Sequence, residues 1–178
     1  MKPGNYLFCI LITDALVFMN MKRIILGIDP GFADLGYGVI EIGGGKDRCL
    51  AYGSIQTPAK QPLGERLKSA YDQLVAIVDR YDVQAAGIER LFFSVNAKTA
   101  MDVAEARGVI RLCLEQRGIK YLELGPGEIK SAVTGNGRAG KSEMQKMVKM
   151  LLGLKEIPKP DDAADALAVA LATAHMRV

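Results

Sequence analysis

Residues 21–57 read MKRIILGIDPGFADLGYGVIEIGGGKDRCLAYGSIQT, and the fold class follows from the pattern of this stretch. It contains three apolar segments, at 24–29, 36–42 and 48–57, of the kind that form strands. The links between them are short, and three consecutive glycines form a turn after the second segment. The stretch therefore predicts three strands in an antiparallel meander.

Helices and strands alternate after the meander. Residues 62–81 carry apolar side chains three and four positions apart, as an amphipathic helix does. We expect further strands at 83–89 and 119–124, and further helices at 96–117, 128–133, 142–152 and from Asp161 or Asp162 onward. This order predicts an α/β protein with a five-stranded mixed sheet flanked by helices on both faces.

Length and composition narrow the chemistry. The chain has 178 residues, 49% of them hydrophobic and 24% charged, which suits one folded domain. Its net charge of +3 neither requires nor excludes a nucleic acid partner. Three cysteines without metal-ligand spacing argue against a disulfide scaffold and a cysteine zinc site. Because His175 is the single histidine, we expect catalysis to rest on carboxylates and lysines.

Residues 1–20, MKPGNYLFCILITDALVFMN, stand apart from the predicted domain. Residues 6–19 are mostly apolar, like the core of a signal peptide, but Asp14 interrupts them and no small-residue cleavage site follows. The segment is also too short and too interrupted for a membrane span, so we expect no membrane association. We interpret residues 1–20 as an N-terminal extension or as upstream codons, and residues 21–178 as the functional domain.

Carboxylates occupy special places on this map. Asp29 ends the first strand and Glu89 ends the fourth, while Asp162 and Asp165 lie three residues apart at the start of the last helix. Asp161 and Asp165 are four apart, so helix geometry does not choose between the two pairs. Convergent carboxylates bind Mg²⁺ or Mn²⁺, and two ions about 4 Å apart can hydrolyse a phosphodiester. Each residue also has a structural interpretation, Asp29 as a turn residue and Asp161 or Asp162 as a helix cap.

The motifs GIDPG, GYGVI, IERLFF, IKSAV, GKSEM and DAADALAVA follow one another along residues 21–178. With them the chain resembles the RuvC family, Holliday-junction resolvases of RNase H-like fold. The resemblance implies a homodimeric, divalent-metal-dependent endodeoxyribonuclease, a hydrolase that nicks two opposing strands of a four-way DNA junction symmetrically in recombination and repair. It also implies the RuvA–RuvB branch-migration complex as a partner and a cytoplasmic location.

The same resemblance assigns the catalytic and metal-binding carboxylates to Asp29, Glu89, Asp162 and Asp165, with Mg²⁺ or Mn²⁺ as cofactor and two ions per site. The family's D-x-x-D-A-L-A pattern falls on Asp162 and Asp165. Asp161 is then interpreted as a flanking cap residue.

DNA-binding residues are implied in the same way. Lys141 would be catalytic and contact the scissile phosphate, while Lys130 and Arg138 would bind the DNA backbone. Phe92 would stack on an unpaired base and help to open the junction core. The alternatives are solvated helix charges for the basic residues, and a core or dimer-interface position for Phe92 and Phe93.

The predicted helix at 96–117 carries a stripe of small and apolar residues, either a core face or part of a dimer interface. The stripe consists of Ala97, Ala100, Met101, Ala104, Gly108 and Leu112. Sequence alone does not separate the two interpretations.

Residues 135–142, GNGRAGKS, match the G-x-x-x-x-G-K-[ST] pattern of a nucleotide-binding P-loop. A P-loop follows a strand, whereas residues 128–134 look helical and no later strand ends in an acidic residue, so we expect no nucleotide cofactor. An actin-like ATPase would need two copies of its sheet domain, and 178 residues do not hold two copies. The loss of one of the four carboxylates would favour a non-catalytic junction-binding protein, but all four are present. Ribonucleases acting on hybrids or on pre-ribosomal RNA share the fold, but IERLFF and DAADALA favour the resolvase.

Overall fold

Five strands form one mixed sheet in the computed structural model, which describes residues 22–31, 33–58, 60–90 and 97–176, with residues 97–100 as backbone only. The strands run in the order β3–β2–β1–β4–β5 across the sheet. β1, β2 and β3 are antiparallel neighbours, whereas β4 and β5 extend the sheet parallel to β1. Their bounds are β1 Arg23–Asp29, β2 Asp34–Ile42, β3 Arg48–Gln56, β4 Ala85–Glu89 and β5 Lys120–Leu124. The predicted meander and mixed sheet are confirmed.

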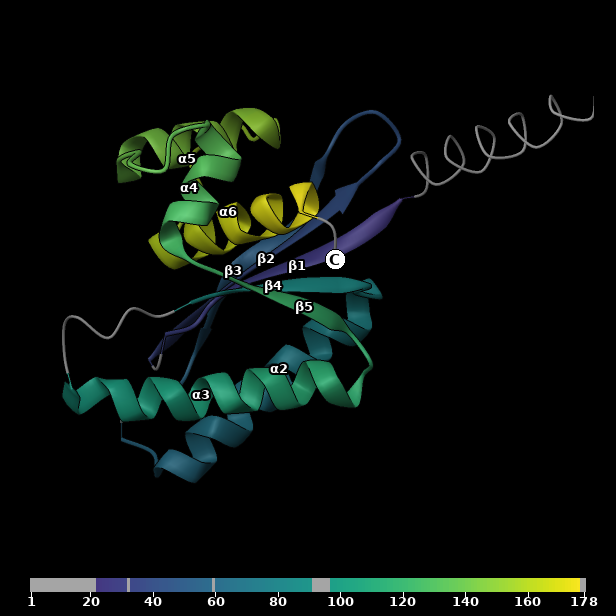
Figure 1. The fold of residues 1–178 in the computed structure, drawn as a ribbon. Helices are drawn as coiled ribbons and strands as arrows, with labels where there is room; N and C mark the ends of the chain where they lie inside the picture. The colour runs from purple at the N-terminus through teal and green to yellow at the C-terminus, as the bar shows by residue number, and fades with distance from the viewer. Residues whose placement is uncertain (1–21, 32, 59, 91–96, 177–178) are drawn as a thin grey trace, which may run out of the picture.

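Helices cover both faces of the sheet (Figure 1). α4, α5 and α6 lie on one face, and α2 and α3 lie on the other. α4 and α5 pack on α6, which lies directly against the strands. The bounds are α2 Leu63–Tyr81, α3 Ala97–Gln116, α4 Pro126–Thr134, α5 Lys141–Leu151 and α6 Asp161–His175. None of the helices in the described ranges is both long and apolar enough to cross a membrane.

The bounds of the helices and strands differ from the predicted ones by a few residues. The start of α4 is the difference that has a clear physical reason. This helix begins at Pro126, two residues before the predicted start. Its first turn closes through the Glu128 carboxylate, which accepts a hydrogen bond of 2.6 Å from the Gly125 amide. Proline at the first helical position and a capping carboxylate three residues after the cap both favour this start.

A row of glycines brings α6 close to the sheet. Gly38, Gly27 and Gly87 are neighbours on β2, β1 and β4 in the observed register. A Cβ atom on Gly27 would lie 2.0 Å from the carbonyl oxygen of Ala166, and one on Gly87 would lie 1.9 Å from Oγ1 of Thr173. A Cβ on Gly38 would meet Leu167 at 2.8 Å. The alanine-rich helix therefore packs on strand backbone, at a distance that side chains would prevent.

The stripe predicted on α3 does not face the core. Met101 and Leu112 are 70% and 52% exposed, and Ala104 and Gly108 are exposed with them. The buried side of α3 consists instead of Ala106, Ile110, Cys113 and Leu114. The core interpretation is therefore wrong for these four stripe residues, while the side chains of Ala97 and Ala100 lie outside the description. The spacing of small and apolar residues identifies a face of the helix, but it does not show which face of the helix packs against the sheet.

The glycine-rich segment at 135–140 joins two helices. Gly135 ends α4 with a positive φ of 76°, and α5 begins at Lys141. A P-loop would instead join a strand to a helix. The nucleotide-binding motif is therefore present in sequence without its structural context.

Gly27→Ala should lower the free energy of unfolding by about 3 kcal/mol or more, because the new methyl group meets the backbone of α6 and either the helix or the strand must move. Chemical unfolding measures the change. Gly64→Ala in α2 is the matched control, since its Cβ would meet nothing within 4 Å. It should leave stability unchanged or raise it by about 0.5–1 kcal/mol. Equal stability of the two variants would contradict the close packing of α6.

Candidate active site

Two carboxylates meet where parallel strands end. Asp29 is the last residue of β1 and Glu89 the last of β4. The register pairs Ile28 with Ile88, so Asp29 and Glu89 occupy the next position on adjacent strands. Carboxyl ends of parallel strands open at the same edge of a sheet, and ligands commonly bind there.

α6 brings two more carboxylates to this edge from its first turns. Asp162 and Asp165 lie three residues apart on α6. A Cβ on Gly36, which pairs with Asp29 in the sheet, would lie 2.3 Å from the carbonyl oxygen of Asp162. The close approach of α6 to the strands therefore places Asp162 beside the end of β1.

The four carboxylates form one electrostatic cluster. Burial, together with the charges of Glu89, Asp165 and Asp162, raises the pKa of Asp29 to about 7. Burial and the charge of Asp165 raise the pKa of Glu89. Burial is also the main cause of the raised pKa values of Asp162 and Asp165. Burial is the first cause of all four raised pKa values, and neighbouring carboxylates add to it, so the site is arranged to receive positive charge.

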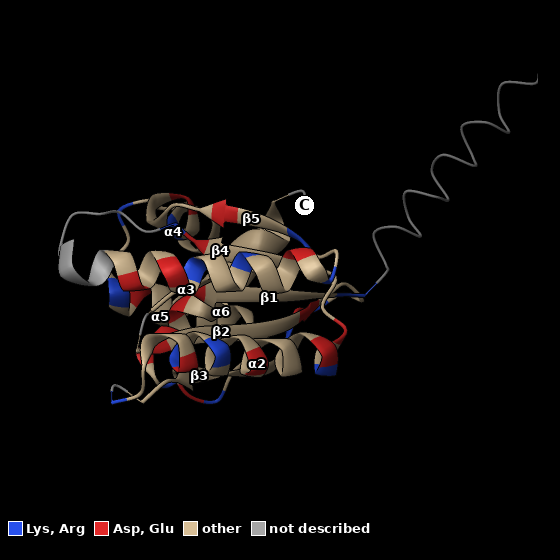
Figure 2. Ribbon diagram, turned by 90° about the horizontal axis from the view of Figure 1, so that it is seen from below, with Lys and Arg blue, Asp and Glu red and all other residues tan. Residues whose placement is uncertain are grey.

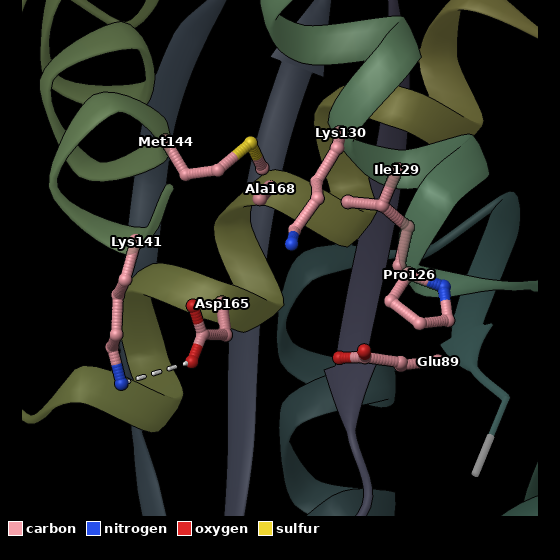
Figure 3. Close-up of a pocket in the computed structure, with 8 residues that line it drawn as sticks. All are labelled: Glu89, Pro126, Ile129, Lys130, Lys141, Met144, Asp165 and Ala168. Atoms are coloured by element: carbon pink, nitrogen blue, oxygen red, sulfur yellow. Dashed lines mark ion pairs between the residues drawn. The ribbon is translucent and has the colours of Figure 1, made fainter. Parts of the chain in front are cut away.

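A cavity of about 200 Å³ lies beside the cluster. Glu89 and Asp165 direct their carboxylates into it, and Lys130 of α4 extends its amine into the space between them (Figure 3). Lys141, the first residue of α5, lines the opposite side, with its Nζ 3.6 Å from Oδ2 of Asp165. Pro126, Ile129, Met144 and Ala168 form the apolar wall. Both lysines that the sequence singled out therefore border the acidic cluster.

Asp161 does not cap α6. Pro160 occupies the cap position, and it has no side chain that could accept a hydrogen bond from the helix. Asp161 instead pairs with Lys141, whose Nζ is 2.9 Å from Oδ2, and accepts a hydrogen bond of 3.2 Å from Gln145. The hydrogen bond from Lys141 lowers the pKa of Asp161. The cap interpretation is therefore wrong, because α5 presents a lysine to this position and sequence spacing does not reveal such a neighbour.

The other predicted DNA contacts have different outcomes. Arg138 is exposed in the segment between α4 and α5, outside the cavity lining, and its backbone amide bonds the Asn136 side chain. Phe92 and Phe93 lie outside the described residues.

A divalent cation fits the chemistry of the donor set. Hard carboxylate oxygens are what Mg²⁺ and Mn²⁺ prefer, and a bound cation would offset the burial and the repulsion that together raise the pKa of Asp29. In the orientations seen, however, no three Asp, Glu, His or Cys side chains within the described ranges are grouped closely enough to chelate one ion. The four carboxylates thus share one site without forming a closed coordination shell.

Asp29→Asn should stabilise the metal-free protein at pH 8. The pKa of Asp29 is about 7 in the folded protein against an ordinary 3.8, so ionised Asp29 is disfavoured by folding. The protonated form contributes stability at low pH, and this contribution is lost as the pH rises through about 7. Unfolding in EDTA should show a gain of about 2–4 kcal/mol at pH 8 and a smaller gain at pH 5. Asp79→Asn is the control, because the hydrogen bond from Arg117 holds the pKa of Asp79 below its usual range and no gain is expected. A gain at Asp29 that does not depend on pH would contradict this account.

Comparison with known proteins gives the family. The family model described as Crossover junction endodeoxyribonuclease RuvC matches residues 25–173. Relatives of that name from Treponema denticola and Halothermothrix orenii are 47% and 50% identical, over 85% and 83% of this chain and 85% and 90% of their own lengths. The solved structure of T. thermophilus RuvC in complex with Holliday junction substrate matches with a TM-score of 0.82 and 35% identity, over 85% of this chain and 93% of that chain. The sheet and its helices thus form the RNase H-like fold of these resolvases, and the chain belongs to the RuvC family.

Proposed function

We propose that this protein is a structure-selective endodeoxyribonuclease that resolves four-way DNA junctions by symmetric paired nicks, in recombination and repair. The observation that carries the proposal is the cluster of Asp29, Glu89, Asp162 and Asp165 at one sheet edge, bordered by two lysines. The RuvC relative that is solved with a Holliday junction shares the fold over most of both chains. Acidic groups for a metal and basic groups for phosphate are what phosphodiester hydrolysis needs.

Asp29, Glu89, Asp162 and Asp165 are the residues that would hold the cation, and we propose two Mg²⁺ ions per site. Bound divalent cations supply an activated water and stabilise the leaving oxygen of the phosphodiester. The carboxylates hold their positions because they stand on strand ends and on a buried helix. Water is the nucleophile in this scheme, since no cysteine or histidine is among the described residues that line the cavity beside the cluster.

The lysines act on the phosphate. Lys141 stabilises the charge that develops on the scissile phosphate, because its Nζ already lies beside two carboxylates of α6. Lys130 faces the space between Glu89 and Asp165, where it would bind a backbone phosphate (Figure 3). Arg138 is exposed beside these helices and would extend the contact with the DNA backbone. The role of Phe92 in opening the junction core stays a prediction.

We propose that the protein acts as a homodimer through α3. The exposed stripe of Met101, Ala104, Gly108 and Leu112 offers a face of small and apolar residues on which a second copy of the helix can pack. Acidic and basic residues are mixed elsewhere on α2 and α3 (Figure 2). A two-fold dimer would give one active site for each of two opposing strands of a junction. Cooperation with a RuvA–RuvB complex, a cytoplasmic location and the interpretation of residues 1–20 stay predictions.

Wild-type protein with Mg²⁺ should nick synthetic four-way junctions and leave linear duplexes uncut, and EDTA should abolish the nicking. Asp29→Asn and Glu89→Gln should each lower the rate by roughly 10³-fold or more, since each removes a carboxylate from the cation site. Asp79→Asn should keep the wild-type rate, because Asp79 pairs with Arg117 away from the cluster. Product analysis on denaturing gels measures all four.

Nicking that persists in Asp29→Asn, or that does not discriminate junctions from duplexes, would contradict the proposal. ATP hydrolysis that Lys141→Ala abolishes would instead support the P-loop interpretation of residues 135–142.

Leu112→Glu should convert the dimer into a monomer, because it places a charge in the stripe on α3. Sedimentation or light scattering measures the mass. Met150→Glu is the matched control, since Met150 is 63% exposed on α5, on the other face of the sheet. The control should remain dimeric. Leu112→Glu that keeps the wild-type mass, or a wild type that is monomeric at micromolar concentration, would contradict the α3 interface.

A further inference from the structure

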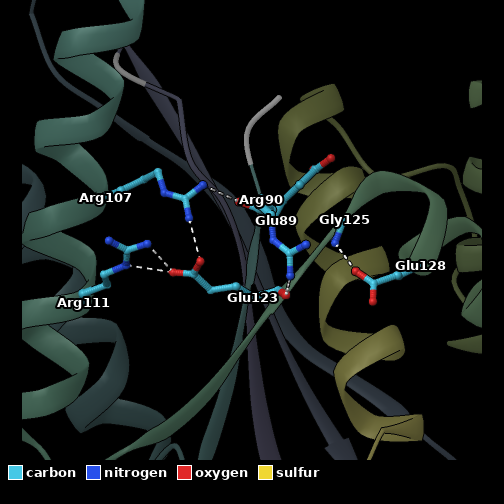
Figure 4. A network of polar contacts seen from close by, with 7 residues as sticks. All are labelled: Glu89, Arg90, Arg107, Arg111, Glu123, Gly125 and Glu128. Carbon is cyan, nitrogen blue, oxygen red and sulfur yellow. Dashed lines mark hydrogen bonds and ion pairs between the residues drawn. The ribbon is translucent and has the colours of Figure 1, made fainter. Parts of the chain in front are cut away.

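Glu89 is held from behind by a polar network on the α3 side of the sheet (Figure 4). Glu89 lies one residue beyond the part of β4 that pairs with β1, and it pairs with Leu124 of β5 on its other edge. Nη1 of Arg107 donates a hydrogen bond of 3.2 Å to the backbone carbonyl oxygen of Glu89. A side chain of α3 thereby fixes the backbone from which the Glu89 carboxylate projects.

The same guanidinium is anchored to β5. Nη2 of Arg107 lies 3.0 Å from Oε2 of Glu123, and Arg111 binds the other carboxylate oxygen with Nη2 at 2.6 Å and Nε at 2.7 Å. Arg90, the residue after Glu89, is tied to β5 as well, because its Nη2 donates to the carbonyl oxygen of Glu123 at 2.8 Å. Glu123 therefore holds the end of β4 in two ways, with its carboxylate through Arg107 and with its backbone carbonyl through Arg90.

Burial separates the two arginines of this network. The side chain of Arg107 is 10% exposed, whereas that of Arg111 is 45% exposed and is bonded to Glu123 without reaching Glu89. A buried guanidinium is costly unless it has partners, and the planar fork of Arg107 reaches two acceptors that belong to different strands. A lysine has a single ammonium in place of the fork and cannot reproduce both bonds in this geometry.

We propose that Arg107 is a positioning residue that sets the place of Glu89 in the cation site. The inference rests on the proposed function, since it assumes that Glu89 helps to hold a divalent cation. Groups that orient metal ligands from behind influence metal affinity although they do not touch the metal. Arg107 does so here through the backbone carbonyl of the ligand.

The test compares Arg107→Lys with Arg111→Lys, a matched change on the same helix and the same carboxylate. Arg107→Lys should raise the Mg²⁺ concentration for half-maximal junction nicking about tenfold or more, and calorimetry on the protein alone should show the same loss of Mg²⁺ affinity. Junction binding in EDTA and the oligomeric state should be unchanged. Arg111→Lys should keep the wild-type Mg²⁺ response. Glu123→Gln, which weakens the anchor of Arg107, should shift the response in the same direction as Arg107→Lys.

The outcomes separate this inference from the proposed function. A wild type that nicks without divalent metal would overturn the proposed metal-dependent function and this inference with it. Glu89→Gln that binds Mg²⁺ normally would overturn Glu89 as a cation ligand, and with it this inference. If Glu89→Gln loses Mg²⁺ binding while a folded Arg107→Lys responds to Mg²⁺ as the wild type does, the positioning role alone is wrong. If Arg107→Lys does not fold, Glu123→Gln decides by the same Mg²⁺ titration.

Discussion

The packing of α6 on bare strand backbone is the constraint on which the rest of the molecule depends. One row across three strands has no side chains, because it consists of Gly27, Gly38 and Gly87, and the alanines of α6 have small side chains that allow the helix to approach this row. α6 is therefore buried along most of its length, with α4 and α5 packed on its outer side. Because the helix is fixed this closely, its first turns stand next to the end of β1, and the carboxylates there have defined neighbours.

The same packing creates an electrostatic cost. Four carboxylates share this corner, and burial raises the pKa of each one, with a further rise from the charges of neighbouring carboxylates. Lys141 and Lys130 offset part of this repulsion, Lys141 at Asp29 and Asp165 and Lys130 at Glu89. The start of a helix also favours negative charge through its exposed amides. The site therefore holds more negative charge than stability alone would favour, which is common where groups are arranged for function.

Much of this arrangement could be predicted from the chain. Apolar periodicity located the strands and helices to within a few residues, and the places of Asp29 and Glu89 at strand ends indicated that they would meet. The pairings that depend on contacts between distant segments could not be predicted. The register that aligns Gly27 with Gly38 and Gly87, and the salt bridge between Lys141 and Asp161, exist only once the sheet and α6 are assembled.

The orientation of α3 on the sheet could not be predicted from the sequence either. Its small residues were visible in the sequence, but periodicity gives the angle between positions and not the direction of the sheet. Arg107 was overlooked because an arginine on a helix is usually a solvated charge. A usable signal in the sequence is helical spacing, since Arg107 lies three residues before Ile110 and seven before Leu114 and so shares a helix face with two large apolar residues. A charged residue at a core position must find partners, and here those partners are the carboxylate of Glu123 and the backbone of Glu89.

Glu89, at the end of β4, interacts with helices on both faces of the sheet. From one face, α6 sets Asp165 opposite the Glu89 carboxylate, and the charge of Asp165 raises the pKa of Glu89 (Figure 3). From the other face, α3 reaches the Glu89 backbone through Arg107 (Figure 4). On its edge toward β5 the strand end is also held in the sheet, since Glu89 pairs with Leu124 and the Arg90 amide donates to the Leu124 carbonyl oxygen at 2.7 Å. Glu89 is therefore contacted from both helical layers, at its carboxylate from α6 and at its backbone from α3.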